Sequence, residues 1–178
     1  NQDVNFGPDT TNSIYEHQFI SLLENNQKVL TDWDQLLRYP KNNFLALTFD
    51  DGFYDFLELV LPYIERFKVR VLLFVTTGFI SGKSEPYEYV LADLVSKITE
   101  ITDLDGNNLE CNNSSEKEKA YQSLRMSLKT KSPQARKEKI QRLIVSNDFK
   151  NQEFKAPRML TWDDVKFLSK HPLVDIGA

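Results

Sequence analysis

The sequence is short of several residue types, and each shortage narrows what the chain can be. A single cysteine, Cys111, stands among 178 residues, so no disulfide can form within the chain. It lies in the polar stretch 107–115, where we expect an incidental surface thiol. The two histidines, His17 and His171, are not spaced as a metal-binding pair on one helix or strand. We therefore expect structural roles for both.

The chain also lacks an excess of positive charge and long apolar runs. The chain has 22 Lys and Arg against 26 Asp and Glu, a formal net charge of −4, which gives no support for a nucleic-acid partner. No apolar run is long enough to cross a bilayer, and there is no signal-peptide pattern. At 40% hydrophobic residues the chain can build a sizeable core. We expect a soluble protein, with secretion and a cell-envelope location both left open.

The most informative feature that is present is a pair of adjacent carboxylates, Asp50 and Asp51, followed by Gly52. The pair follows an apolar run, residues 44–47, typical of a buried parallel strand. Open α/β sheets and βα-barrels place their chemistry at the C-terminal ends of strands. Because neighbouring strand residues point to opposite faces, one acid can bind a metal while the other takes a proton from water. The alternative is an acidic turn that merely closes a strand; the strong strand and the Thr-Phe before the pair favour a site.

The rest of the chain alternates between strand and helix patterns. We predict parallel strands at 44–49, 69–75 and 174–178, and a helix with Thr161 as its N-cap, which gives an α/β fold. Residues 83–156 differ, because they are charged and rich in helix patterns. There we predict helical spacing over 87–100, a small hairpin over 101–110, a helix from Asn113 to about Thr130, and another that starts at Ser132-Pro133. The charged run 116–119 and the basic stretch 129–139 are interpreted as solvated helix faces, with an interaction surface as the alternative.

These motifs, in this order, resemble the metal-dependent polysaccharide deacetylases (NodB-type, carbohydrate esterase family 4). The resemblance covers roughly residues 12–82 and 156–178, including Thr48–Gly52, Leu160–Val165 and His171–Ala178. It implies a partial irregular (β/α) barrel of the polysaccharide deacetylase type, with residues 83–156 as a helical insertion. The chain, residues 1–178, is then expected to be the N-terminal part of such a domain.

The resemblance also implies a function. It implies metal-dependent hydrolysis of acetyl groups from a glycan, N-acetyl before O-acetyl, with Asp50 as catalytic base and Asp51 as ligand of a divalent metal, expected to be Zn²⁺. In the family, histidine ligands follow the segment that ends here at Ala178, so we expect an incomplete metal site and little activity of the chain alone. The open strand edge is expected to be covered by a missing C-terminal half or by dimerisation.

Aromatic residues close to the motifs have two interpretations. Tyr54, two residues after Gly52, is a possible stacking surface for a sugar ring and a candidate substrate-binding residue. Packing is the favoured interpretation for Phe53 and for Trp162, with a sugar platform as the alternative for Trp162.

Two other classes of protein compete with a deacetylase. Phosphotransfer proteins also carry acids at strand ends, but receiver domains take their phospho-acceptor from a later strand, and aspartate-nucleophile phosphatases space their acids two apart. A non-catalytic carbohydrate-binding relative is the second alternative. Activity on acetylated sugars against acyl phosphates separates the first class from a deacetylase, and the presence of metal-binding histidines separates the second.

Overall fold

A computed structural model describes residues 16–25, 29, 32, 34, 38–39, 44–149 and 156–178. Some residues of the predicted segments lie outside these ranges and are not described, among them 12–15 and 150–155. The described residues divide into two compact units. We call 16–83 with 158–178 the sheet unit, and 84–157 the helical unit. The limits of the helical unit lie within one residue of those predicted for the insertion.

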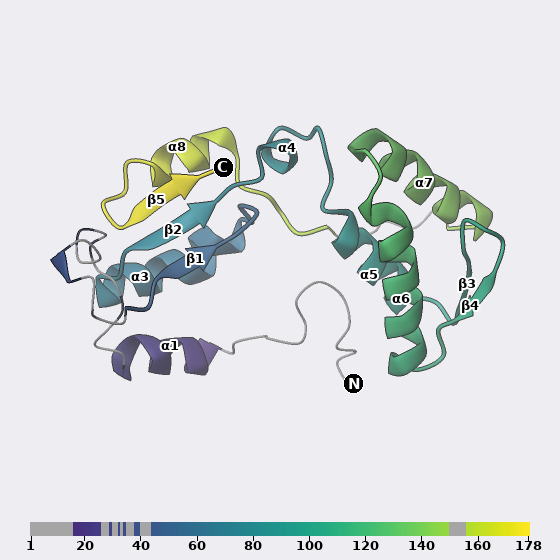
Figure 1. Ribbon diagram of the computed structural model, residues 1–178, viewed down its shortest axis with the longest axis horizontal. Helices are drawn as coiled ribbons and strands as arrows, with labels where there is room; N and C mark the ends of the chain where they lie inside the picture. The colour runs from purple at the N-terminus through teal and green to yellow at the C-terminus, as the bar shows by residue number, and fades with distance from the viewer. Residues whose placement is uncertain are drawn as a thin grey trace. The chain divides into compact units, whose positions relative to one another are not determined.

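The sheet unit is built on three parallel strands (Figure 1): β1 (Leu47–Phe49), β2 (Val71–Phe74) and β5 (Val174–Gly177), in the order β1-β2-β5. Leu47 pairs with Val71, which pairs with Val174 on its other side. The predicted α/β fold with these parallel strands is thereby confirmed, each strand being one to three residues shorter than predicted. Within the described residues the sheet is open and forms no closed barrel.

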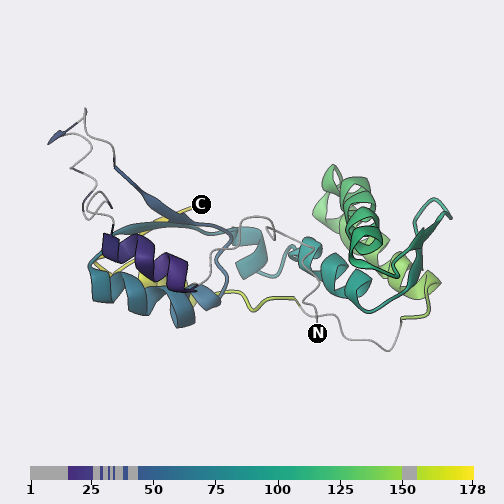
Figure 2. The same ribbon diagram turned by 90° about the horizontal axis from the view of Figure 1, so that it is seen from below.

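Helices cover one face of this sheet. They are α1 (Glu16–Asn25), the π-helix η2 (Phe56–Val60), α3 (Leu61–Phe67) and α8 (Trp162–Leu168), while the short α4 (Thr77–Ile80) follows the end of β2. Figures 1 and 2 place α3 and α8 on the same side of the strands. Alternate strand residues such as Val71, Leu73 and Val174 point to that side and are buried. Together with residues of α1, η2, α3 and α8 they form the apolar core of the sheet unit.

Pro62 explains how η2 passes into α3. Pro62 stands in the first turn of α3, as its lack of an N–H favours. Just before it, the Leu61 N–H reaches back five residues to the Phe56 carbonyl, which is the wide turn of a π-helix. The passage from η2 into α3 follows the Asp50-Asp51 segment in the sequence and sets where α3 starts.

The helical unit contains α5 (Tyr87–Ser96), the antiparallel hairpin of β3 (Glu100–Thr102) and β4 (Asn108–Glu110), α6 (Ser114–Lys129) and α7 (Pro133–Ser146). The predicted hairpin and the two later helices are confirmed. The helical spacing predicted over 87–100 is wrong at its end, because α5 stops at Ser96 and Glu100 already belongs to β3. Ser132 caps α7, and Asn113 caps α6 by accepting from the Glu116 N–H.

Cys111 is buried, so the predicted surface thiol is wrong. Its N–H donates to the Thr99 carbonyl at 2.7 Å, which extends the hairpin by one residue and turns the side chain inward. It joins a core made from α5, α6, α7 and the hairpin that shares no buried residue with the core of the sheet unit. Burial raises the pKa of the thiol, as expected for an inert structural cysteine.

Candidate functional site

The Asp50-Asp51-Gly52 segment forms a tight left-handed turn at the C-terminal end of β1. The Gly52 N–H donates to the Asp50 carbonyl at 2.8 Å, which closes a three-residue turn. Asp51 and Gly52 have φ angles of 67° and 78°, so two successive residues occupy the region that L side chains rarely adopt. Backbone strain of this kind persists only where the surroundings impose it, and it gathers at functional sites.

Thr76, which follows β2, holds the turn from one side. Its hydroxyl donates to Oδ1 of Asp51 at 2.9 Å, and its N–H donates to the Asp51 carbonyl at 3.2 Å. Thr76 is the N-cap residue of α4 but makes no capping bond with its side chain. A hydroxyl that would ordinarily cap a helix is thus directed to Asp51 instead. The space beside Gly52 is also tight, since a Cβ there would lie 3.2 Å from Cγ1 of Val75.

The segment Arg158–Leu160 holds the turn from the other side. The Leu160 N–H donates to the Gly52 carbonyl at 2.9 Å, and the Tyr54 N–H donates to the Arg158 carbonyl at 2.8 Å. Between these bonds, Phe53 and Met159 form an antiparallel bridge. Sequence reasoning missed this short ladder, because nothing in the sequence near 158–160 indicates pairing with a segment a hundred residues earlier.

The two carboxylates differ in environment. Asp50 is exposed, and its side chain makes no hydrogen bond within the described part of the chain. Asp51 is half-buried, and Thr76 fixes one of its oxygens. An exposed carboxylate can exchange a proton with a water molecule, whereas a carboxylate fixed through one oxygen presents the other in a defined direction. The adjacent acids can therefore perform different tasks, as the sequence predicts.

The two aromatic candidates for sugar binding, Tyr54 and Trp162, differ in how their rings are covered. The Arg158 guanidinium lies 3.4 Å from the ring centroid of Tyr54, so one face of that half-buried ring is already covered. Only the opposite face could receive a sugar, and the substrate role of Tyr54 stays a prediction. Trp162 is 51% exposed in the first turn of α8, so about half of its surface is open to solvent, and its role, packing or sugar platform, stays a prediction.

The described residues do not by themselves make a metal site. No group of three or more His, Cys, Asp or Glu side chains that could hold an ion is found among them. His171 is engaged elsewhere: Nε2 lies 3.0 Å from Oε1 of Glu65, and Nδ1 accepts from the Leu173 N–H at 3.3 Å. A catalytic zinc site generally needs three protein ligands. Asp51 can supply one, so the described donor set does not fit a complete site.

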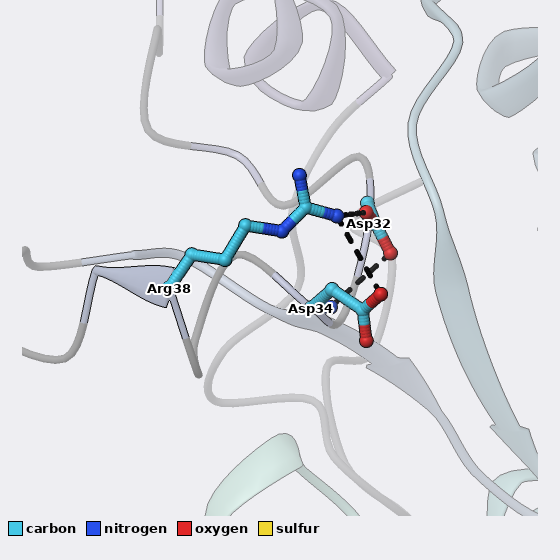
Figure 3. A network of polar contacts seen from close by, with 3 residues as sticks. All are labelled: Asp32, Asp34 and Arg38. Atoms are coloured by element: carbon cyan, nitrogen blue, oxygen red, sulfur yellow. Dashed lines mark hydrogen bonds and ion pairs between the residues drawn. The ribbon is translucent and has the colours of Figure 1, made fainter.

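Other acidic residues of the sheet unit form ion pairs with arginine side chains, as is typical of a structural role. Arg38 lies 3.2 Å from Asp32 and 3.5 Å from Asp34, and the Asp34 N–H donates to Asp32 at 3.1 Å (Figure 3). These exposed pairs contribute at most about 1 kcal/mol each. At the N-terminal end of the sheet, Arg70 binds Asp175 through two hydrogen bonds of 2.6 and 2.7 Å, which raise the pKa of Arg70. All these carboxylates have cationic partners, unlike Asp50 and Asp51.

Comparisons of the chain with protein-family models, with curated proteins and with solved structures found no match. No helix in the described part of the chain is long and apolar enough to cross a membrane.

Proposed function

We propose that this chain supplies the two acidic residues of a carbohydrate deacetylase with a (β/α) barrel of the polysaccharide deacetylase type. The observation that supports the proposal best is the strained turn at the end of β1, where Asp50 is exposed and Asp51 is fixed by Thr76. The C-terminal end of a parallel strand is where α/β enzymes hold catalytic groups. The order of motifs in the sequence supports an acetylated glycan as the substrate, N-acetylated in preference to O-acetylated.

Asp50 is the general base in this proposal. Hydrolysis of an acetamide requires that a water oxygen attack the acetyl carbon while the water loses a proton. The exposed Asp50 carboxylate can accept that proton. When the C–N bond breaks, the departing nitrogen takes up a proton, and the products are acetate and a free amine. A base placed in this way contributes about 10²- to 10⁴-fold to the rate.

Asp51 is the predicted ligand of a divalent metal, and a bound metal supplies activation of water and polarisation of the acetyl carbonyl. The described residues provide no complete ligand set, and Asp51 is the ligand that they contribute in this proposal. What this chain does provide is the orientation of Asp51. The Thr76 hydroxyl and the Gly52–Leu160 hydrogen bond hold the turn on both sides.

Release of acetate from a chitin hexasaccharide by the full-length protein tests the proposal. Asp50→Asn is expected to lower the rate by about 10²- to 10⁴-fold. Asp55→Asn is the matched control. Asp55 is an exposed acid five residues after Asp50, and although it is the N-cap residue of η2 its side chain makes no capping hydrogen bond. Its rate should stay within a factor of two or so. Equal loss in both variants, or no loss in Asp50→Asn, contradicts the assigned base.

Metal content separates the two acids. Asp51→Asn should lower the metal content of the purified protein, while Asp50→Asn should leave it unchanged, since a ligand contributes to binding and a base to the chemical step. Equal metal loss would show that the division of roles is wrong. Glycan binding without any acetate release by the unmodified protein would favour a non-catalytic carbohydrate-binding relative.

A further inference from the structure

A cleft of about 610 Å³ lies within the helical unit, between the turn of the hairpin and α7. Thr102, Asp103 and Leu104 of the hairpin line one side, and Lys139, Arg142 and Val145 of α7 line the other. The three α7 residues are spaced by three, so they project from one face of the helix. The size falls within the range of small-molecule sites.

Asn147 fixes the two walls of this cleft against each other. Its side-chain oxygen accepts from the Thr102 N–H at 2.7 Å, and its side-chain nitrogen donates to the Thr102 carbonyl at 3.0 Å. The same nitrogen donates to the Leu143 carbonyl of α7 at 2.9 Å. One amide thus joins the hairpin to the end of α7, and the cleft exists before any ligand arrives. A preformed site loses less conformational entropy on binding.

Asp103, the one carboxylate in the cleft lining, is held by its own loop. Its carboxylate accepts from the N–H groups of Asp105 and Asn107, both at 2.8 Å, and from the Asn107 side chain at 3.1 Å. These donors, the Asn107 side chain first, lower the pKa of Asp103. The turn is therefore rigid, and the acid is already satisfied.

Lys139 and Arg142 line the cleft and form no ion pair within the described residues. Other basic side chains of the helical unit are engaged: Arg125 binds Glu88 at 2.6 Å, Arg136 stacks on Tyr87, and Lys137 lies 3.5 Å from Glu85. Two cations on one rim of the cleft, against the single Asp103 carboxylate on the other, leave the lining net positive. An arginine beside a lysine suits a carboxylate, which can accept several hydrogen bonds at once.

We propose that this cleft binds an acidic sugar unit of a glycan, with the sugar carboxylate against Lys139 and Arg142. Leu104 and the exposed Val145 offer apolar surface to the C–H face of a ring, and Gln141 offers an amide to hydroxyl groups. Among the described residues no aromatic side chain lines the cleft, so they offer no stacking surface of the kind on which nucleic-acid bases are held. The choice of a glycan rests on the proposed function, while the choice of an anion rests on the cleft.

Calorimetric titration of the full-length protein at low salt tests this inference. The probes are an oligogalacturonate, a neutral chitin hexasaccharide and an oligothymidylate of similar length. Oligogalacturonate should bind best, and its affinity should fall by about 10- to 100-fold when both Lys139→Gln and Arg142→Gln are introduced, since hydrogen bonds to a charged group are lost. The matched control is Lys129→Gln with Lys131→Gln, which removes the same charge from two exposed lysines outside the cleft lining. It should lower the affinity about threefold at most, through the long-range field alone.

Equal weakening by the control and cleft variants would overturn the inference, because binding would then be non-specific attraction to a basic surface. Equal or better binding of the neutral oligosaccharide or of oligothymidylate would overturn it too, as would absence of binding to oligogalacturonate. The thermal midpoint checks folding, and the single variants repeat the test if the double variant unfolds. Binding is measured without catalysis, so a failed deacetylase assay leaves this result standing.

Discussion

The sheet unit and the helical unit treat unusual backbone geometry differently. In the sheet unit, Asp51 and Gly52 place two positive φ angles side by side at the end of β1. In the helical unit the positive φ angles occur singly, at Gly106 in the hairpin turn and at Asp148 just after α7, as they also do at Lys68 and Gly82 of the sheet unit. The isolated ones are ordinary devices for reversing a chain. The adjacent pair costs about 1–3 kcal/mol at Asp51 alone and needs external support.

The support around that pair indicates where function lies. Thr76 and Leu160, from segments distant in the sequence, both bond to the turn. The helical unit instead uses Asn147 and Asp103 to stiffen a cleft whose lining carries two cations against one carboxylate. One unit orients reactive carboxylates, and the other presents charge to a ligand. If the two units differ in this way and have separate cores, substitutions in one unit should leave the other unit unaffected.

Truncation of one core should leave the other intact. Leu124 and Leu73 are 1% and 0% exposed in the cores of the helical and sheet units. Leu124→Ala and Leu73→Ala should each destabilise their own unit by about 2–5 kcal/mol, through lost contacts and the cavity left behind. Hydrogen exchange measures this by segment: Leu124→Ala should accelerate exchange in α5 and α6 and leave β2 protected, and Leu73→Ala the reverse. Loss of protection in both units from either variant would show that the cores unfold together.

Two glycine substitutions sharpen the comparison of turns. Gly106 has a φ of 86° with no atom within 4 Å of an added Cβ, whereas Gly52, with a φ of 78°, would place its Cβ 3.2 Å from Val75 and 3.6 Å from Ile80. Gly106→Ala should cost about 1–2 kcal/mol, the left-handed penalty alone. Gly52→Ala should cost about 1 kcal/mol more, because the crowded Cβ is added to that penalty. Urea unfolding followed separately in each unit measures both, and equal costs would mean that the β1 turn is no more constrained than the hairpin.

Acid should weaken both units slightly and through different carboxylates. Hydrogen bonds from Thr161 lower the pKa of Asp164 at the start of α8, and those from Asn107 lower that of Asp103. The fold favours the charged form in each case, so the stabilisation is present above the unfolded pKa of about 4 and is lost as pH falls through the lowered folded value. Each contributes less than about 1 kcal/mol, since both sites are near solvent. Asp164→Asn should remove part of the acid sensitivity of the sheet unit only, and Asp103→Asn that of the helical unit only. The unfolding midpoints of each unit at pH 7 and pH 3 give the answer.

Local signals in the sequence predicted much of the fold. The caps at Asn113, Ser132 and Thr161 each follow from one polar residue before a helical pattern, and the parallel strands follow from short apolar runs. The end of α5 was missed, because the apolar spacing of the helix continues through Ile98 into β3, although the helix stops at Ser96.

Long-range pairing could not be predicted. Burial of Cys111 depends on the bond of its N–H to Thr99, while its polar neighbours suggest exposure. The Asp50-Asp51 pair was visible as a motif, but the bonds from Thr76 and Leu160 that shape its turn come from distant segments without a local pattern. The cleft likewise depends on Asn147, one asparagine at the end of a helix, meeting the hairpin.

Steady-state kinetics of the full-length protein on two acetylated substrates tests the division of labour most directly. One substrate is a short neutral chitin oligosaccharide, and the other is a longer glycan that carries both acetamido groups and carboxylates, such as a hyaluronan oligosaccharide. Asp50→Asn should lower kcat by about 10²-fold or more on both. The variant with Lys139→Gln and Arg142→Gln should raise KM by about 10-fold on the acidic substrate alone and leave kcat unchanged. A fall in kcat on the neutral substrate in the cleft variant, or unchanged kcat in Asp50→Asn, would contradict the account.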